Sequence, residues 1–461
     1  MNERQFASAL HRGLGSAIVF LQQADDASRY KEIVLSRCLR PVDYDAQSEG
    51  TRARYLWQAI CLCRDKEYFE GPIIAKLMSC RQHWLTSQLA EMLVLFARGG
   101  SETSAAGLRA KYAQFAGRRR LANGFNGDGD RWEAVAMELL DVDGFASFKR
   151  YITDVGQYLR RHPEDLGGPS YDWYLSVAKG RFGGRATRFL DPSSTSTRRS
   201  QEELDSVIAL AKDVERWEGM RRAHRSTQNK QAVTLSDVEA KARELAARDL
   251  RHYGSIYATK RAFMAGASDA DKLQLANMVI AENDETTQGW LLQAFAREPF
   301  PLGPSRLLGY LESDNETLRG AAINVLQVCR DGAVHAAAIR LLQTRGIESG
   351  GLTLLEVNYR RSDDQVIVDA VKRSRTMPHG AVMSLRNIYV HHHSARALPA
   401  LLRAYNDGDC AYCRWGIVQA MVYCRVLPEK IINECQFDSY DDTRKLARRL
   451  IARRGHPTLV A

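Results

Sequence analysis

Apolar residues recur with the spacing of an α-helix along almost the whole sequence. In residues 84–100 they return every three or four positions until Gly99 and Gly100 end the pattern. Residues 316–329 show the same spacing, and no stretch of useful length alternates between polar and apolar residues as a strand does. The sequence therefore predicts an all-α protein, with helices of about 10–18 residues separated by short breaks.

One stretch of the sequence recurs farther along the chain without a gap. Residues 302–330, moved by 95 positions, align with residues 397–425. The copies share a proline, an aspartate and an arginine, which are Pro304, Asp314 and Arg319 in the first and Pro399, Asp409 and Arg414 in the second. Each copy predicts a helix after the proline, a turn at the aspartate and a second helix. A third copy begins at Pro428, turns at Asp438 and reaches Arg444.

This pattern resembles the HEAT repeat, a helical hairpin of about 30–40 residues that stacks into a superhelix. The resemblance is clearest over residues 302–330 and 395–454. It implies an α-solenoid, because a single hairpin cannot bury its apolar face without a neighbour. In HEAT-like repeats the turn aspartate and the second-helix arginine commonly link neighbouring units. The resemblance therefore implies a scaffolding role for four residues, Asp314, Arg319, Asp409 and Arg414.

Composition divides the chain into three predicted regions. Residues 1–162 are expected to form an N-terminal array of helical hairpins, and residues 255–461 a C-terminal array of HEAT-like repeats. Residues 163–254 are expected to form an irregular insert or linker followed by polar helices. This boundary rests on residues 163–200, which combine glycine, serine, proline and arginine with little apolar periodicity.

Cys410 and Cys413 have the spacing of a zinc clip or a redox pair. The repeat, however, aligns Cys413 with the core residue Leu318, and small thiols suit close helix packing. On one helix Cys413, Cys424 and Cys435 would also lie about 16 Å apart, too far to share an ion with sulfur ligands at about 2.3 Å. We therefore expect buried thiols and no metal or other cofactor, with zinc and redox chemistry as the alternatives.

Two further motifs resemble metal sites but lack the required geometry. Three consecutive histidines, residues 391–393, would point about 100° apart on a helix and could not converge on one ion. A connection between repeats is expected there, with Ser394 capping the next helix. Residues 126–133 resemble a calcium loop through Asn126, Asp128 and Asp130, but Arg131 occupies the position that requires glycine. We expect a surface loop.

The formal net charge of +10 is compatible with an anionic partner. Clusters of arginine could follow a phosphate backbone, although a solvated helix face explains the same clusters without any ligand. The candidate nucleic-acid contacts are Arg118, Arg119, Arg120, Arg221, Arg222 and Arg225.

The remaining sequence features narrow the class of protein. The odd number of cysteines and the lack of a long apolar run predict a cytoplasmic protein without a membrane partner. The sequence contains no phosphate loop, nucleophile elbow or dinucleotide fingerprint, so no catalytic residue or small-molecule substrate is evident. We expect a non-catalytic scaffold or adaptor in a bacterial assembly, with a protein as its partner. DNA or RNA binding is the alternative, and a HEAT-like enzyme such as a DNA glycosylase or a lyase is the third reading.

Overall fold

The computed structural model describes residues 1–118, 120–122, 127–165, 168–195, 199–228, 233–248 and 254–454 of the chain. Every regular element in these ranges is a helix, which confirms the predicted all-α class. The chain divides into two compact units. The first unit comprises Met1–His224 and Ile432–Ala461, and the second comprises Arg225–Ile431. No helix in the described ranges combines the length and the apolar character needed to cross a bilayer.

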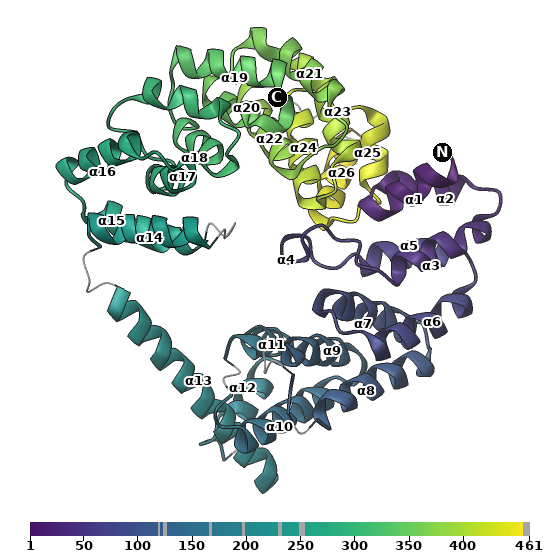
Figure 1. The fold of residues 1–461 in the computed structure, drawn as a ribbon. Helices are drawn as coiled ribbons and strands as arrows, with labels where there is room; N and C mark the ends of the chain where they lie inside the picture. Colours follow the sequence, from purple (N-terminus) through teal and green to yellow (C-terminus); the bar gives the residue numbers. More distant parts are fainter. Residues whose placement is uncertain are drawn as a thin grey trace. The chain divides into compact units, whose positions relative to one another are not determined.

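The helices of the first unit form successive hairpins, each of which contacts the next. Packing joins α5 to α7, α7 to α9 and α9 to α11 (Figure 1). The bounds are α1 Glu3–Arg12, α2 Gly15–Gln23, η1 Ala27–Tyr30, α3 Lys31–Cys38, α4 Ala46–Glu49, α5 Ala53–Leu62, α6 Lys66–Ser79, α7 His83–Arg98, α8 Glu102–Ala116, α9 Asp128–Val142, α10 Phe145–Arg161, α11 Gly168–Phe182, α12 Gly184–Leu190, α13 Gln201–Gln228 and α26 Asp441–Arg454.

The apolar stripe predicted within residues 84–100 forms the buried face of α7. Gly99 ends the helix as predicted. The stripe faces the core, because all five of its members are buried, namely Leu85, Leu89, Met92, Leu93 and Phe96. A 3.6-residue apolar period therefore gives both the position and the orientation of this helix correctly.

Residues 163–200 are more helical than their composition predicts, because they include α11 and α12. Aromatic packing accounts for the difference. Tyr174 of α11 is fully buried, and its ring centroid lies 4.3 Å from that of Tyr151 and 6.3 Å from that of Phe148, both on α10. A few large aromatic rings thus bury enough apolar surface to hold these helices in place, although the segment contains few apolar residues. The two polar helices predicted to follow are present as α13 and α14 (Leu235–Ala247).

Glu434 and Ser439, in the C-terminal part of the first unit, pack against the first hairpin. The amide of Ser439 donates to the carbonyl oxygen of Gly13 at 2.9 Å. A Cβ placed on Gly15 would overlap the main-chain oxygen of Glu434, which lies in α25 (Glu429–Cys435). Backbone therefore approaches backbone here without a side chain between the two helices, and only glycine fits at position 15.

The second unit continues the pattern of stacked hairpins. Its remaining bounds are α15 Gly254–Gly266, α16 Asp269–Ala281, α17 Glu285–Leu292, η3 Gln293–Phe295, η4 Pro304–Glu312, α18 Glu316–Leu326, α19 Gly332–Thr344, η5 Ile347–Ser349, α20 Gly351–Asn358, η6 Arg361–Asp363, α21 Asp364–Arg373, α22 His379–His392, η7 Ala395–Ala397, α23 Leu398–Asp407 and α24 Ala411–Tyr423. The two sequence copies coincide with the pairs η4/α18 and α23/α24. The first helix of the earlier copy is a tighter 3₁₀ helix.

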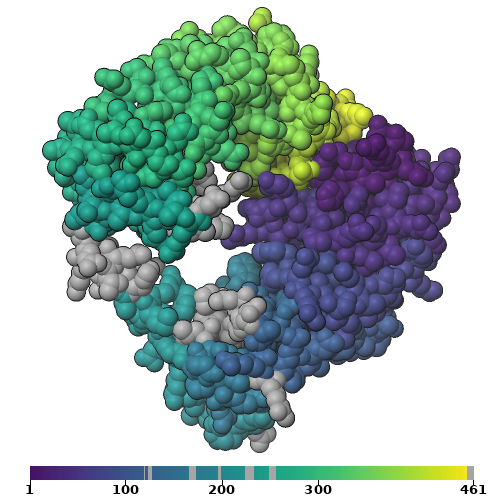
Figure 2. Space-filling view, in the orientation of Figure 1, coloured from purple at the N-terminus to yellow at the C-terminus, as the bar shows by residue number. Residues whose placement is uncertain are grey.

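Helices in equivalent positions of successive hairpins lie beside one another. One row contains η4, α19, α21 and α23, and the other contains α18, α20, α22 and α24, with each helix touching the next in its row (Figure 1). In Figure 2 the atoms of these hairpins, coloured green, lie in contact and form a continuous surface. Each hairpin is therefore covered on its flank by the one that follows.

Arginines on helices of the first row bind the helix that precedes them in that row, and so link each hairpin to the one before it. The guanidinium groups donate to main-chain oxygens at or near the ends of the preceding helices, from Arg345 to Glu312 at 2.8 Å, from Arg373 to Leu342 at 3.0 Å and from Arg403 to Ser374 at 3.1 Å. The last carbonyls of a helix lack intrahelical donors and carry partial negative charge, so a cation satisfies both needs. We call this set the arginine ladder.

The four residues expected to act as scaffold are in different surroundings. Arg319 donates to the carbonyl of Ser313 at 2.6 Å, within its own hairpin. Arg414 is fully buried, whereas Asp409 is exposed. Asp314 is exposed and lies 3.9 Å from Arg345 of the following hairpin, at the limit of an ion pair.

Buried Asp364 gathers hydroxyl groups from three elements. Its carboxylate accepts from Tyr359 at 2.8 Å, from Tyr389 at 3.2 Å and from Ser394 at 2.5 Å. The capping role expected for Ser394 is therefore wrong, because its hydroxyl turns to this carboxylate and makes no capping bond to η7. The shared carboxylate fastens the ends of α20 and α22 to the start of α21.

Candidate functional site

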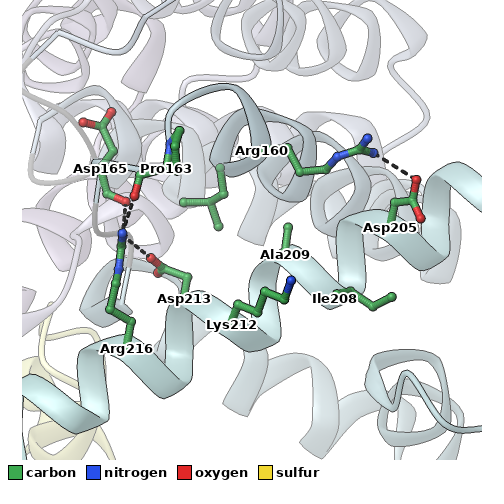
Figure 3. A pocket seen from close by; sticks show the side chains of 10 residues that line it. Arg160, Pro163, Asp165, Asp205, Ile208, Ala209, Lys212, Asp213 and Arg216 are labelled. Atoms are coloured by element: carbon green, nitrogen blue, oxygen red, sulfur yellow. Dashed lines mark hydrogen bonds and ion pairs between the residues drawn. The ribbon is translucent and has the colours of Figure 1, made fainter.

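A polar groove lies between α10 and α13 in the first unit (Figure 3). Its volume is about 460 Å³. The end of α10 and the turn after it form one wall, and one face of α13 forms the other. The lining residues are Leu159, Arg160, Pro163, Asp165, Asp205, Ile208, Ala209, Lys212, Asp213 and Arg216.

Ion pairs occupy both ends of the groove. At one end Arg160 lies 3.2 Å from Asp205, and at the other Arg216 lies 2.9 Å from buried Asp213. Lys212 is exposed and lies between these pairs in Figure 3. Among the lining residues that the structure describes, Lys212 is the cation without an ion pair. The groove therefore combines nearly balanced charge with one available ammonium group.

Arg216 also holds the turn that forms the opposite wall. Its guanidinium donates to the carbonyl of Asp165 at 2.6 Å and to that of Pro163. The hydroxyl of Tyr158 donates to the Asp165 carboxylate and accepts from the amide of Leu121 at 3.3 Å. Burial and the neighbouring carboxylate raise the pKa of Tyr158 to about 12, so the phenol stays protonated at neutral pH.

Four of the arginines predicted to contact nucleic acid, Arg118, Arg120, Arg221 and Arg222, lie in two places in the first unit. Arg118 pairs with Asp128, and Arg120 lies 3.6 Å from Glu164, beside the groove. Arg119 lies outside the described residues, as does the side chain of Arg225. On α13, Arg221 stacks over Trp217 at 4.5 Å and Arg222 lies 3.6 Å from Glu218. Carboxylates thus accompany three of these cations, which weakens their combined attraction for phosphate.

The segment compared with a calcium loop is built differently from the expected surface loop. Asp128 opens α9 and is fully buried. Its carboxylate accepts from the amide of Ala122 at 2.9 Å and from Arg118 and Arg131. The expectation of a surface position is therefore wrong for Asp128. Its charge is neutralised by arginines, so nothing in this arrangement favours a calcium ion.

The second unit contains a cluster that the sequence analysis did not find. His379, at the start of α22, has its Nδ1 atom 3.4 Å from the sulfur of Cys413 on α24. The sulfur of Cys410, at the N-cap of α24, accepts from the Cys413 amide at 3.4 Å. Both cysteines are buried, in agreement with the expected core positions. The available signal was the separation of 34 residues between His379 and Cys413, about one hairpin period.

The three consecutive histidines do not converge. His391 and His392 are the last residues of α22, and His393 ends the helix in a left-handed conformation with φ of 52°. The ring of His392 packs 4.6 Å from Tyr359, and that of His393 stacks 5.6 Å from Tyr423. The expectation that they share no ion is consistent with these separate ring partners.

A protonatable carboxyl group lies between α7 and α9. Burial, together with the charges of Glu91 and Asp141, raises the pKa of Glu138 to about 8. Glu91 is paired with Arg54 at 3.0 Å, and Asp141 with Arg98 at 2.7 Å. Sequence reasoning had no means of finding this group, because the effect depends on helices that are distant in sequence.

Comparison with known proteins gives no family. No family model matches the sequence, and no curated protein matches it. The candidate sites above therefore rest on their geometry and chemistry.

Proposed function

We propose that this protein is a non-catalytic α-solenoid of HEAT-like hairpins that binds an extended segment of a protein partner. Two rows of helices in the second unit, the first of which is tied together by the arginine ladder, support the solenoid reading. Stacked hairpins of this kind offer long surfaces whose area grows with each repeat.

The observation that carries the choice of partner is the balanced charge of the groove between α10 and α13. A nucleic-acid site requires unopposed cations along the path of the backbone. Here Arg160 and Arg216 are each paired with a carboxylate of the groove itself. Mixed donors and acceptors suit a polypeptide, whose main chain presents both kinds of group.

Lys212 determines which charge on the bound segment is favoured. An ammonium group between two satisfied ion pairs favours a carboxylate on the incoming segment. The proposed ligand is therefore an extended, polar peptide with an acidic residue facing α13.

Site-specific photo-crosslinking tests this proposal. A photoreactive residue at Ile208, within the groove, should capture a protein that the same group at exposed Lys179 of α11 does not. With the captured protein in hand, Lys212→Glu should weaken binding at least about tenfold at low salt, and Lys179→Glu should have little effect. Equal affinities of the two variants, or equal capture at both positions, would remove the groove as the binding site.

Nucleic-acid binding remains the competing outcome of the same experiments. A gel-retardation assay at low salt detects it where electrostatic attraction is strongest. Replacing Arg221, Arg222 and Arg225 with glutamine would lower the salt slope by about two to three units if these side chains contact phosphate. Retardation that the triple variant abolishes would support the nucleic-acid reading in place of a protein partner.

A further inference from the structure

We infer that His379, Cys410 and Cys413 form a binding site for one zinc ion that joins two neighbouring hairpins of the second unit. This inference is independent of the proposed partner, because it uses residues of a different unit and a different ligand. It rests on three features, which are the identity of the donor atoms, their separation and the helix ends that present them.

The donor set is one that zinc prefers. Two thiolates and one imidazole provide soft and borderline ligands, which select zinc over calcium or magnesium. Their ligand atoms all lie within 4.8 Å of one another. Among the described residues, these are the three histidine, cysteine or acidic side chains whose ligand atoms lie close enough together to share one ion.

The separations match a tetrahedral ion after a small adjustment. Ligands at about 2.0–2.3 Å from zinc place a sulfur and a nitrogen about 3.6 Å apart, and two sulfurs about 3.8 Å apart. The Sγ atom of Cys413 and the Nδ1 atom of His379 are 3.4 Å apart. Side-chain rotations that move the ligand atoms by roughly 1 Å bring the other distances between them to the values that a tetrahedral zinc ion requires. His379 is half-buried, so its ring has room to turn.

The backbone around the cluster favours thiolate over thiol. Cys410 is the N-cap of α24, and Cys413 lies in the first turn of that helix. His379 is the first residue of α22. The amino ends of two helices of 13 and 14 residues therefore meet at the sulfur atoms. Their partial positive charge lowers the energy of an anionic sulfur, as does the Cys413 amide, which donates to the Cys410 sulfur at 3.4 Å, and the anionic sulfur is the form that binds metal.

The repeat architecture explains how the ligands come together. Helices α22 and α24 occupy equivalent places in successive hairpins and pack side by side. Cys410 and Cys413 come from one hairpin and His379 from the hairpin before it. A zinc ion there connects two hairpins that otherwise adhere through apolar packing and the arginine ladder. Three protein ligands leave the fourth tetrahedral position to water.

Metal titration of the reduced full-length protein tests the site. Cobalt(II) is the spectroscopic probe, because tetrahedral cobalt with thiolate ligands absorbs strongly and zinc displaces it. We expect one cobalt per chain, displaced by one zinc. Cys413→Ser and His379→Asn should each weaken zinc binding by at least about 100-fold, since each removes a direct ligand.

Matched variants separate the site from general effects on folding. Cys424→Ser removes another buried thiol, at the carboxyl end of α24, and His391→Asn changes an exposed histidine of α22. Both should bind zinc within about threefold of the unaltered protein. Zinc should also raise the unfolding temperature of the unaltered protein but not that of Cys413→Ser.

Two results would overturn the inference. The first is reduced, folded protein that takes up no cobalt and contains no zinc after purification. The second is an equal loss of metal from Cys424→Ser and Cys413→Ser. If a ligand variant shows no helical circular dichroism, it has not folded. The cobalt stoichiometry and the cobalt spectrum of the unaltered protein then decide whether the site exists.

Discussion

The guanidinium of Arg403 in α23 donates to the main-chain oxygen of Ser374, which follows α21, at 3.1 Å. This bond is one rung of a ladder that repeats every hairpin. It joins a cation to a carbonyl that the preceding helix leaves without a donor. The stability of the stack should therefore depend on such rungs, in addition to its apolar core.

Replacing Arg403 with methionine should destabilise the second unit by about 1 kcal/mol. The variant keeps much of the apolar stem and loses the charged hydrogen bond, whose strength partial exposure reduces, together with the ion pair to Asp407 of the same helix. Hydrogen exchange of the amides in α21 and α23 reports the change locally. Arg396→Met, at an exposed residue of η7, is the control, and equal effects of the two changes would refute a role for the ladder.

The carboxylate of Asp364 should be among the most sensitive positions in the second unit. Asp364→Ala strands three hydroxyl groups, two of them on tyrosines with raised pKa values, in a buried place. The expected loss is about 3 kcal/mol of unfolding free energy. Asp369→Ala removes a carboxylate from the same helix that bonds only to exposed Gln365, and should cost less than about 0.5 kcal/mol. Urea unfolding of both variants checks the difference.

The stability of the first unit should depend on the protonation of Glu138. Its pKa of about 8 lies above the usual value of 4.5, so the native state retains a proton that the unfolded chain releases between these pH values. The stabilising contribution is fully present below pH 4.5 and is lost as the pH rises through 8.

Glu138→Gln should remove this pH dependence, because glutamine stays neutral. At pH 8.5 the variant should be more stable than the unaltered protein by about 1–2 kcal/mol, and near pH 5 the advantage should shrink. Thermal unfolding across this range measures the effect. Glu67→Gln, at an exposed position of α6, should leave the profile unchanged, and a parallel shift in both variants would argue against burial as the cause.

The contact between α2 and α25 should not tolerate a methyl group. Gly15→Ala places Cβ on the main-chain oxygen of Glu434, a rigid atom, so the helices must separate. We expect a loss of more than about 2 kcal/mol and faster amide exchange in α26. Gly219→Ala, in the open interior of α13, has nothing within 4 Å and should stabilise the protein by about 0.5–1 kcal/mol. Protection of α26 that survives in Gly15→Ala would contradict this account.

Local features of the fold could be predicted from the sequence. The apolar stripe of α7 and the hairpins at 302–330 and 397–425 each depend on residues close together in the chain. Helical periodicity records which side of a helix is buried, so these predictions needed no knowledge of neighbours. The helix α11 was missed because its burial comes from the rings of α10, on a different segment.

The candidate sites depend on contacts across longer separations. The spacing of Cys410 and Cys413 was visible in the sequence, but His379 becomes their neighbour only through the stacking of α22 on α24. Likewise, the sequence at 118–120 reads as a cationic cluster, but in the structure Arg118 is paired with Asp128 and Arg120 lies 3.6 Å from Glu164. Counting charges in a short stretch of sequence omits the carboxylates that folding brings next to those charges from other segments.

The contact between the first hairpin and α25 sets an order of events during synthesis. Gly13 and Gly15 leave the ribosome roughly 420 residues before Glu434 and Ser439, a delay of about 20–80 s at ordinary rates of translation. Throughout that interval one flank of α1 and α2 has no native partner. The earliest helices to be made are thus among the last to be completed, and in the meantime their uncovered flank is a place where a chaperone could bind.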